Sequence, residues 1–581
     1  MRYFLKKTKR TRGDYLQIYQ SEYIRGVGSR NKSFKALGYV DDMLKNGVKD
    51  PVAKAEAEVK RLNAELQAKE DNEKARKIGK TSPLKHIGYF VLKAVSNSLV
   101  DFEKAMRLIS SVRDFQYDVY DLMMALAYAR ATAPASKRRT HAEILPRLFE
   151  KPDDESYPQV LSCCEYIGSE YRKIIALLTR SIERTYGLDC NKTYFDCTNF
   201  YFEIDKEDEF RRKGPSKEKR TDPIVGMGLL LDANQIPIAM DLFPGNEAEG
   251  PHLRKTIQRM KKSSCISGRT IQVADKGLNC AANIHSALEN GDGYLFSKSL
   301  KKQSQEEIEW FLSLDSNSWD AVYESDGKGG KRISYRYYSF IDTFDYCYDD
   351  ENGSHVRFSA REKRIITFNP KLRMKKILEL NKMVEKAKGL CLSHAKRDEF
   401  GECSRFVSFI SDNGNKARAV LNSDAIELER RLAGYNMLVT SELRLNDRTI
   451  YNTYHNLWRI EQSFRMMKSY LDARPVYLTG IDSIKGHFLI CYISVVLERL
   501  LEFKVLGNRF SHEKIMDFIR AFSLVRLNSK DYVNLLTSDD ELGQFLADTI
   551  LPEVTNYMLS PADVTKLLKV RFKSLIIDAG H

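Results

Sequence analysis

Three carboxylates are distinguished by the residues that surround them. Asp196 lies inside the apolar segment TYFDCT, Asp275 follows the apolar segment TIQVA, and Glu461 lies in the amphipathic segment YHNLWRIEQSFRMMKS. A carboxylate inside a buried strand costs free energy unless it is paired or bound to a metal ion. A carboxylate at the carboxyl end of a strand lies where open α/β sheets place functional groups.

The sequence around Glu461 predicts a long helix over about 447–472. Tyr454, Trp458, Arg465 and Lys468 lie at offsets of −7, −3, +4 and +7 from Glu461. On a continuous helix all five side chains share one face. Such a face combines an acidic group with basic groups that could hold phosphates.

Each carboxylate also has an ordinary structural role. A strand aspartate can cap a turn or pair with an arginine, and an aspartate after a strand is often a helix N-cap. Glu461 with Arg465 fits an i,i+4 ion pair. Taken singly, each ordinary role outweighs the catalytic one. Taken together, the three carboxylates favour a catalytic role. If the first and fourth strands of the core are neighbours, Asp196 and Asp275 meet at one edge, where a helix could present Glu461.

Oxygen ligands without neighbouring Cys or His favour Mg²⁺ or Mn²⁺. Phosphoryl-transfer sites hold two such ions about 3.5–4 Å apart. The ten cysteines contain no CxxC pair, which argues against a zinc site and indicates a reducing cytosol. The sequence therefore predicts a two-ion site built from carboxylates.

Composition and charge narrow the class of protein. The 581 residues suggest several domains, and 43% hydrophobic residues exclude global disorder. With 93 basic and 79 acidic residues, the formal net charge is +14. This bias suits a polyanion such as nucleic acid, although a merely basic protein fits it equally well. No signal peptide is expected, and the longest apolar run, 488–497, is too short to span a bilayer, so we expect a cytoplasmic protein.

From residue 190 the alternation of β-forming and helical segments predicts an α/β core. Its elements follow the order strand, strand, strand, helix, strand, helix, strand, which indicates helices packed on a mixed sheet. Residues 301–432 interrupt this order with β-like runs and one helix. The segment YNMLVTSEL then resumes a buried strand, and a last helix is expected at about 481–503.

Five segments, in this order along the chain, resemble the DDE-type transposases of bacterial insertion sequences. They are YFDCTNFYFE, GPSKEKR, LFPGN, VADKG and YHNLWRIEQSFRMMKS. They are most similar to the branch with a Tyr-Arg-Glu-Lys signature and a β-rich insertion before the final Glu. The resemblance covers about residues 190–500 and implies an RNase-H-like core in which Asp196, Asp275 and Glu461 bind the metal ions.

The spacing of the three acids agrees with this resemblance. Asp196 and Asp275 are 79 residues apart (275 − 196), and Asp275 and Glu461 are 186 apart (461 − 275). The insertion at 301–432 accounts for the longer gap.

The helix signature of the family runs Tyr, two residues, Arg, three residues, Glu, six residues, Lys. Tyr454, Glu461 and Lys468 fit it, but Leu457 occupies the arginine position. Arg459 or Arg465 could substitute, although neither has the register of the missing arginine.

The VADKG motif also departs from the family, because Lys276 follows Asp275 where arginine is common. Lysine keeps the charge but loses the bidentate fork. The residues expected to contact DNA are Tyr454, Lys468, Arg465, Arg459, Lys276, Lys217 and Arg220. For Trp458, core packing is favoured over stacking on a flipped base.

Composition and periodicity also divide the chain into parts. These are a small basic β module at 1–48, a helical DNA-end-binding region at 49–188, the core at 189–300 and 433–503, the β-rich insertion at 301–432, and a helical C-terminal region at 504–581. The β module could grip DNA phosphates or be a solvated hairpin. A linker is expected at Lys80–Pro83.

The implied activity is metal-dependent hydrolysis at the ends of an element, then attack of the freed 3′-OH on target DNA. The implied partner is double-stranded DNA, bound by a homodimer because two ends must be joined, in a prokaryotic cytoplasm at the nucleoid. One alternative is an RNase-H-like nuclease without strand transfer. Another is a non-catalytic DNA-binding derivative of a transposase.

We predict that DNA binding weakens steeply with salt, because each phosphate contact releases counterions. Six or more contacts would reduce affinity by roughly a thousandfold or more between about 50 and 200 mM salt. Titration of a labelled duplex at several salt concentrations measures the slope. An affinity for DNA that does not change with salt would contradict the prediction that the basic surface binds DNA.

Overall fold

The protein is described from a computed structural model that covers residues 2–24, 28–78, 84–150, 155–218, 220–315, 318–325, 330–393, 397–410 and 418–576. The expected linker at Lys80–Pro83 lies outside these residues. The chain forms two compact units. Unit 1 contains 1–88 and 521–568, and unit 2 contains 89–520 and 569–581. Each unit is described by itself.

Unit 1 begins with an antiparallel three-stranded sheet of alternating polar and apolar residues. Its strands are β1 (Arg2–Arg10), β2 (Gly13–Ile24) and β3 (Gly28–Tyr39), followed by α1 (Val40–Lys45) and α2 (Pro51–Ala75). Asn63 fixes α2 to β1, because its side chain accepts from the Tyr3 N–H and donates to the Tyr3 carbonyl, both at 2.8 Å. Asp50 caps α2 by accepting from the Ala53 N–H at 2.9 Å.

The C-terminal part of unit 1 is not purely helical, contrary to the sequence prediction for 504–581. Short strands β16 (Ser523–Arg526), β17 (Tyr532–Asn534) and β18 (Met558–Leu559) form a sheet with β4 (Leu84–His86). Helices α18 (Glu541–Thr549) and α19 (Pro561–Lys569) accompany them. The strands were missed because β16 and β17 are only four and three residues long and β16 pairs with a segment from the other end of the chain.

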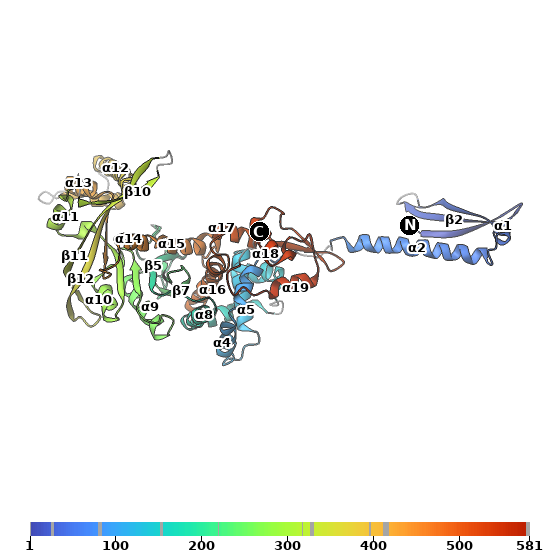
Figure 1. Ribbon diagram of the computed structural model, residues 1–581, viewed down its shortest axis with the longest axis horizontal. Coiled ribbons are helices and arrows are strands. Elements are labelled where there is room, and N and C mark those ends of the chain that lie inside the picture. The colour runs from blue at the N-terminus through green and yellow to red at the C-terminus, as the bar shows by residue number, and fades with distance from the viewer. Residues whose placement is uncertain are drawn as a thin grey trace. The chain divides into compact units, whose positions relative to one another are not determined.

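The first part of unit 2 is a helical layer. Its helices are α3 (Phe90–Ser96), α4 (Val100–Ser110), α5 (Val119–Thr132), α6 (Lys137–Arg139), α7 (Tyr157–Ser169) and α8 (Tyr171–Tyr186). The buried helix α16 (Ile481–Leu500) packs against α7 and α5. Helices α16 and α5 lie next to each other in Figure 1. Among the described helices, none combines the length and apolarity needed to cross a membrane.

The second part of unit 2 is the mixed sheet that the α/β prediction requires. The strands β5 (Lys192–Tyr201), β6 (Ile224–Leu231) and β7 (Pro237–Pro244) are antiparallel neighbours. On the other side of β5, strands β8 (Ile271–Ala274) and β9 (Gly293–Lys298) run parallel to it. The predicted neighbourhood of the first and fourth core strands is therefore present, and the order β7-β6-β5-β8-β9 forms the expected RNase-H-like core.

The predicted insertion does not form a separate β layer, because its long strands extend the core sheet. Strand β12 (His355–Phe368) pairs with β15 (Tyr435–Thr440), which pairs with β9. Strands β11 (Lys331–Asp349) and β10 (Asp320–Ser325) follow outward, giving nine described strands in one sheet. The segment also contains α11 (Gln305–Leu312), α12 (Pro370–Leu392), α13 (Ser423–Leu432) and the hairpin β13 (Val407–Ile410)–β14 (Arg418–Leu421).

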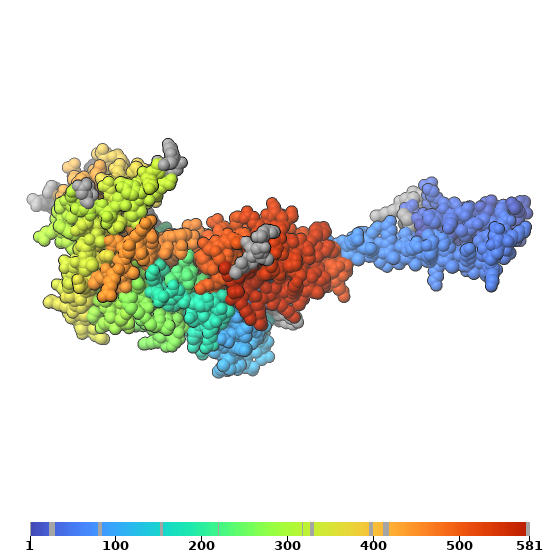
Figure 2. All heavy atoms as spheres, viewed as in Figure 1, coloured from blue at the N-terminus to red at the C-terminus, as the bar shows by residue number. Residues whose placement is uncertain are grey.

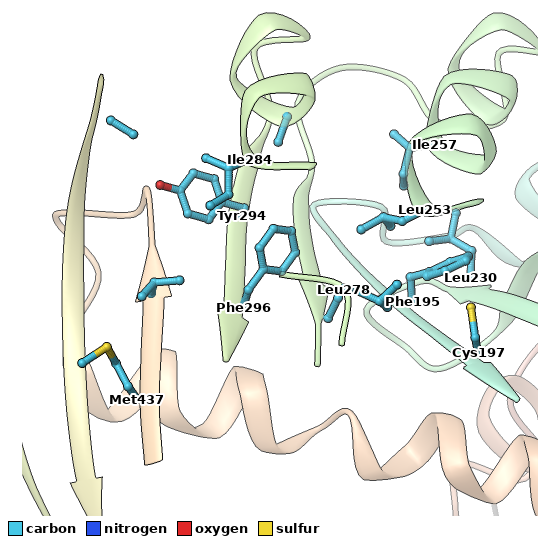
Figure 3. Close-up of a cluster of buried hydrophobic side chains, with 14 of the residues drawn as sticks. Phe195, Cys197, Leu230, Leu253, Ile257, Leu278, Ile284, Tyr294, Phe296 and Met437 are labelled. Carbon is cyan, nitrogen blue, oxygen red and sulfur yellow. The ribbon is translucent and has the colours of Figure 1, made fainter. Parts of the chain in front are cut away.

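Helices α9 (Gly250–Lys262) and α10 (Ala281–Glu289) cover one face of the sheet. Leu253, Ile257 and Ile284 extend from these helices toward Phe195 and Phe296 on the strands (Figure 3). All five side chains are nearly or fully buried. Because side chains alternate along a strand, the residues between those of the apolar layer must point to the opposite face of the sheet.

The long helix predicted at 447–472 is broken in the structure. It consists of α14 (Asp447–His455), α15 (Trp458–Arg465) and a π-helical turn, Met466–Tyr470. At the break the Asn456 N–H is shared between the Asn452 and Thr453 carbonyls, and the Leu457 N–H bonds only three residues back, to the Tyr454 carbonyl. Tyr454 and Glu461 therefore do not lie on one continuous helical face, and the wide turn changes the register of Lys468 as well.

We predict that Gly168→Ala destabilises unit 2, because α7 and α16 cross at two glycines. A Cβ on Gly168 would lie 1.7 Å from the Asp482 carbonyl oxygen, and one on Gly486 would lie 1.9 Å from the Cys164 carbonyl oxygen. Backbone atoms cannot move aside as a flexible side chain can, so we expect a loss of about 1–3 kcal/mol or more in the free energy of unfolding.

The matched control is Gly389→Ala on α12, where the added Cβ meets no atom within 4 Å. This change should stabilise the protein by up to about 1 kcal/mol through helix propensity. Denaturant unfolding of both variants measures the difference. Equal stability of the two would contradict the close helix crossing.

Candidate active site

The parallel pairing of three strands sets two carboxylates side by side. Phe195 on β5 pairs with Ala274 on β8, which pairs with Phe296 on β9. One residue further along each strand come Asp196, Asp275 and Ser297. The three polar residues therefore form a row across neighbouring strands, at the carboxyl ends of β8 and β9 and in the middle of β5.

The alternation of side chains along a strand decides which face this row occupies. Phe195, Ala274 and Phe296 belong to the apolar layer beneath α9 and α10. Successive side chains point to opposite faces, so Asp196 and its neighbours in the row point away from that layer. Helix α15 contacts β5, and α14 contacts β8 and β9. The ribbon of these helices passes the ends of the strands in Figure 3.

Asp275 is held by two hydroxyl groups. The Ser297 Oγ and the Tyr454 hydroxyl each donate to its Oδ1 at 3.0 Å. Burial and the Asp275 carboxylate raise the pKa of Tyr454. Tyr454 therefore stays a hydrogen-bond donor and fixes the orientation of an otherwise exposed carboxylate.

Asp196 is more buried, with 23% of its side chain exposed. Its Oδ1 accepts from the Cys197 N–H at 2.7 Å and lies 3.8 Å from the Lys217 Nζ. Burial raises the pKa of Asp196 to about 6; Lys217 opposes this shift, whereas Glu249 and Asp275 add to it. The carboxylates at this position thus exceed the positive charge that one lysine supplies.

The loop before β6 brings Lys217 to this site. Lys217 donates from Nζ to the Cys197 carbonyl, and that Nζ lies 3.6 Å from Glu249. Although burial alone would lower it, Asp196 and Glu249 raise the pKa of Lys217, which keeps the ammonium charged. Asn199 supports the loop, because its side chain donates to the Pro215 carbonyl at 3.0 Å and accepts from the Lys217 N–H at 3.3 Å.

Glu461 lies on α15, the helix that contacts β5, and its side chain is exposed. Within the described ranges, no three Asp, Glu, His or Cys side chains come close enough together to hold a metal ion. The structure thus brings Asp196 and Asp275 close enough to interact, and among the described residues Glu461 completes no three-residue cluster with them.

A basic cluster lies at the far end of β5. Lys468 donates to Glu218 at 3.2 Å, and Arg474 donates to the same carboxylate oxygen. The Lys468 Nζ lies 5.4 Å from the Phe200 ring centroid. Arg220 stacks 3.8 Å from the Tyr201 ring centroid, and Arg474 lies 5.2 Å from it. Three basic side chains thus meet here with two acidic ones, because Arg220 also lies 3.6 Å from Asp222.

The remaining basic residues predicted to contact DNA are exposed or half-buried. Arg465 and Lys276 are exposed, and Arg459 lies 5.7 Å from the Trp458 ring. The expectation that Trp458 packs in the core is wrong, because 51% of its surface is exposed. Figure 2 shows the segment that contains α15 as an orange band on the surface of unit 2.

Four residues of this region were missed from the sequence. Glu249 lies three residues after the LFPGN motif, and Asn199 lies within the YFDCTNFYFE motif, so both had a local signal. Ser297 and Arg474 had none, because only strand register and chain folding bring them to Asp275 and Glu218.

Comparison with known proteins identifies the family of the chain. The family model described as the transposase DDE domain matches residues 198–497, more than half of the chain. The chain belongs to the DDE transposase family. It is therefore a DNA transposase, an enzyme that cleaves and joins DNA. The matched range contains Asp275 and Glu461 and begins two residues after Asp196.

Among solved structures, the chain is similar to a piggyBac transposase in a synaptic complex with hairpin DNA. The identity is 10%, the TM-score is 0.35, and the match covers 82% of this chain and 84% of that one. No curated protein matches the sequence.

We predict that Asp196→Asn changes stability in a pH-dependent way. A carboxyl group with a raised folded-state pKa binds its proton more tightly in the folded state, so wild-type stability falls as pH rises from about 4 to about 6. The variant avoids this cost. Its advantage over wild type should grow by up to about 3 kcal/mol between pH 4 and pH 7 and then level off.

Urea unfolding in chelator-treated buffer at a series of pH values measures this difference. Asp205→Asn, at an exposed position outside the site, is the control and should show no such growth. If the free energies of unfolding of D196N and wild type differ by the same amount at pH 4 and at pH 7, the raised pKa of Asp196 is contradicted.

Proposed function

We propose that this transposase cuts DNA at the ends of an insertion sequence and joins the freed 3′-OH groups to target DNA. Asp196, Asp275 and Glu461 are the proposed metal-binding triad. The observation that carries this proposal is the row of Asp196 and Asp275 on adjacent parallel strands, one residue past the paired Phe195 and Ala274.

The donor set fits Mg²⁺ or Mn²⁺, because it consists of carboxylate oxygens. The raised pKa of Asp196, due to burial and then to neighbouring carboxylates, supports a cation at this position. Both hydroxyl bonds to Asp275 use Oδ1, which leaves Oδ2 for a ligand role. When bound, two ions supply an activated nucleophile and stabilise the leaving oxygen. Glu461 would complete the ligand set from α15.

The protein's own side chains would orient the reacting DNA strand. Tyr454 keeps Asp275 in place through its hydroxyl group. Lys217 balances part of the charge at Asp196. Lys468 and Arg474, which now share Glu218, are proposed to hold a DNA phosphate. Arg474 would thus take the role of the arginine that Leu457 replaces in the family signature.

The proposed partner is double-stranded DNA, at both the element ends and the target, in the cytoplasm of a prokaryote. Joining two ends in one complex requires two active sites, so we propose a homodimer on DNA. The helices within 49–188 are proposed to bind the element ends, together with Arg459, Arg465, Lys276 and Arg220 near the active site. The basic strands β1–β3 are proposed to add phosphate contacts.

We predict that the protein cleaves element-end DNA with Mg²⁺ and that Asp196→Asn or Asp275→Asn reduces the rate by at least about a thousandfold. Glu461→Gln should act similarly if this residue completes the ligand set. Single-turnover cleavage on a denaturing gel measures the rates. Asp205→Asn is the control, and equal cleavage by D196N and wild type would exclude the proposed site.

A joining assay with precut ends separates a transposase that transfers strands from a nuclease that only cuts. Strand transfer into a plasmid supports the proposal, whereas cutting without joining supports the nuclease. Binding without metal-dependent cutting would indicate a non-catalytic derivative. Light scattering of the DNA complex tests the homodimer, and a monomeric complex would contradict it.

A further inference from the structure

A second basic site lies in unit 2, in a pocket of about 400 Å³ between the helical layer and the segment after the π-helical turn. Arg130 of α5, Lys137 of α6 and His487 of α16 line it. These side chains are only 5%, 6% and 5% exposed. None of them was singled out by a motif, because they come from three separated helices.

The pocket lining also contains Arg138 and Asp472, whose charges offset each other, so Arg130 and Lys137 leave the pocket with a net positive charge. Among the described residues, the hydrogen bonds of Arg130 go to the Leu471 and Asp472 carbonyls, at 3.4 and 3.5 Å. Lys137 contacts His487 Nδ1 at 3.2 Å. No carboxylate forms an ion pair with either cation in the part of the chain that the structure describes. A buried cation without a counterion is costly, so a bound anion would stabilise this arrangement.

His487 is neutral, so it carries no negative charge that could balance Arg130 and Lys137. Its Nε2 lies 3.0 Å from the Ala473 carbonyl, which can only accept, so Nε2 donates and Nδ1 accepts from Lys137. Burial, together with Lys137 and Arg130, keeps the pKa of His487 well below its usual value. Burial and Arg130 lower the pKa of Lys137 to about 8, so the ammonium still predominates at neutral pH.

The backbone around Asp472 is arranged to hold these groups. Three consecutive carbonyls, at residues 471–473, accept from Arg130 and His487. Asp472 itself has a φ of 45°, a left-handed conformation that non-glycine residues adopt at a cost. The same segment leads directly from Lys468 to Arg474, the two residues on Glu218 beside the candidate active site.

We propose that this pocket binds the terminal phosphate of a DNA strand. Two cations match the charge of about −2 on a phosphate monoester at neutral pH. Hydrolysis that frees a 3′-OH leaves a 5′-phosphate on the neighbouring nucleotide, so the proposed function generates such a group. A pocket of about 400 Å³ is within the usual range for a small ligand, and the exposed Tyr477 and half-buried Tyr157 on its lining can stack on a base.

The first test uses inorganic phosphate and does not depend on the proposed function. Phosphate should raise the melting temperature of the full-length protein above that in chloride of equal ionic strength. Lys137→Met should remove this gain and, by removing an unpaired buried charge, should melt at or above the wild-type temperature in phosphate-free buffer. Arg130→Met is the second variant. Arg139→Gln, whose exposed arginine pairs with Glu143, is the control and should keep the gain.

The second test compares duplexes with a 5′-phosphate and a 5′-hydroxyl end. Wild type and R139Q should bind the phosphorylated duplex about tenfold more tightly, and K137M should bind both equally. Equal binding by wild type would overturn the assignment to a DNA end, and a phosphate gain alone would then indicate free phosphate as the ligand. Failure to bind either duplex would instead contradict the proposed function.

Discussion

The parallel, in-register pairing of β5 with β8 is the constraint on which the candidate site depends. It sets Phe195 beside Ala274 in the apolar layer and therefore Asp196 beside Asp275 on the opposite face. Strand β9 continues the row with Ser297, whose hydroxyl group orients Asp275. A shift of one residue in this register would exchange the faces, placing the carboxylates in the core.

The second constraint is the balance of charge around Asp196. Lys217 lies between Asp196 and Glu249, so one ammonium serves two carboxylates, with Asp275 adding to the excess. Without a further cation this arrangement opposes folding at neutral pH, as expected for a site shaped by function rather than by stability. At the basic cluster the imbalance is reversed, because Glu218 alone faces Lys468 and Arg474.

The helical layer contributes more than a cover for the sheet. Two glycines let α7 and α16 approach until their backbones touch, and Phe488 of α16 packs on Phe200 of β5 with ring centroids 4.8 Å apart. The same helix places His487 beside Lys137. One buried helix thus contacts both the strand that carries Asp196 and the pocket that we assign to a terminal phosphate.

The sequence by itself determined the carboxylates, the order of the core elements and the family, because apolar strands and short motifs are local signals. Tertiary structure decided what depends on distant segments: the insertion strands that extend the sheet, Ser297 and Arg474 beside motif residues, and the pocket at Arg130. Sequence periodicity predicts one helix that continues through Asn456 and Leu457, whereas in the structure the helix is interrupted at these two residues, before Glu461. Periodicity describes one segment, whereas packing against β5 and β8 decides where that segment bends.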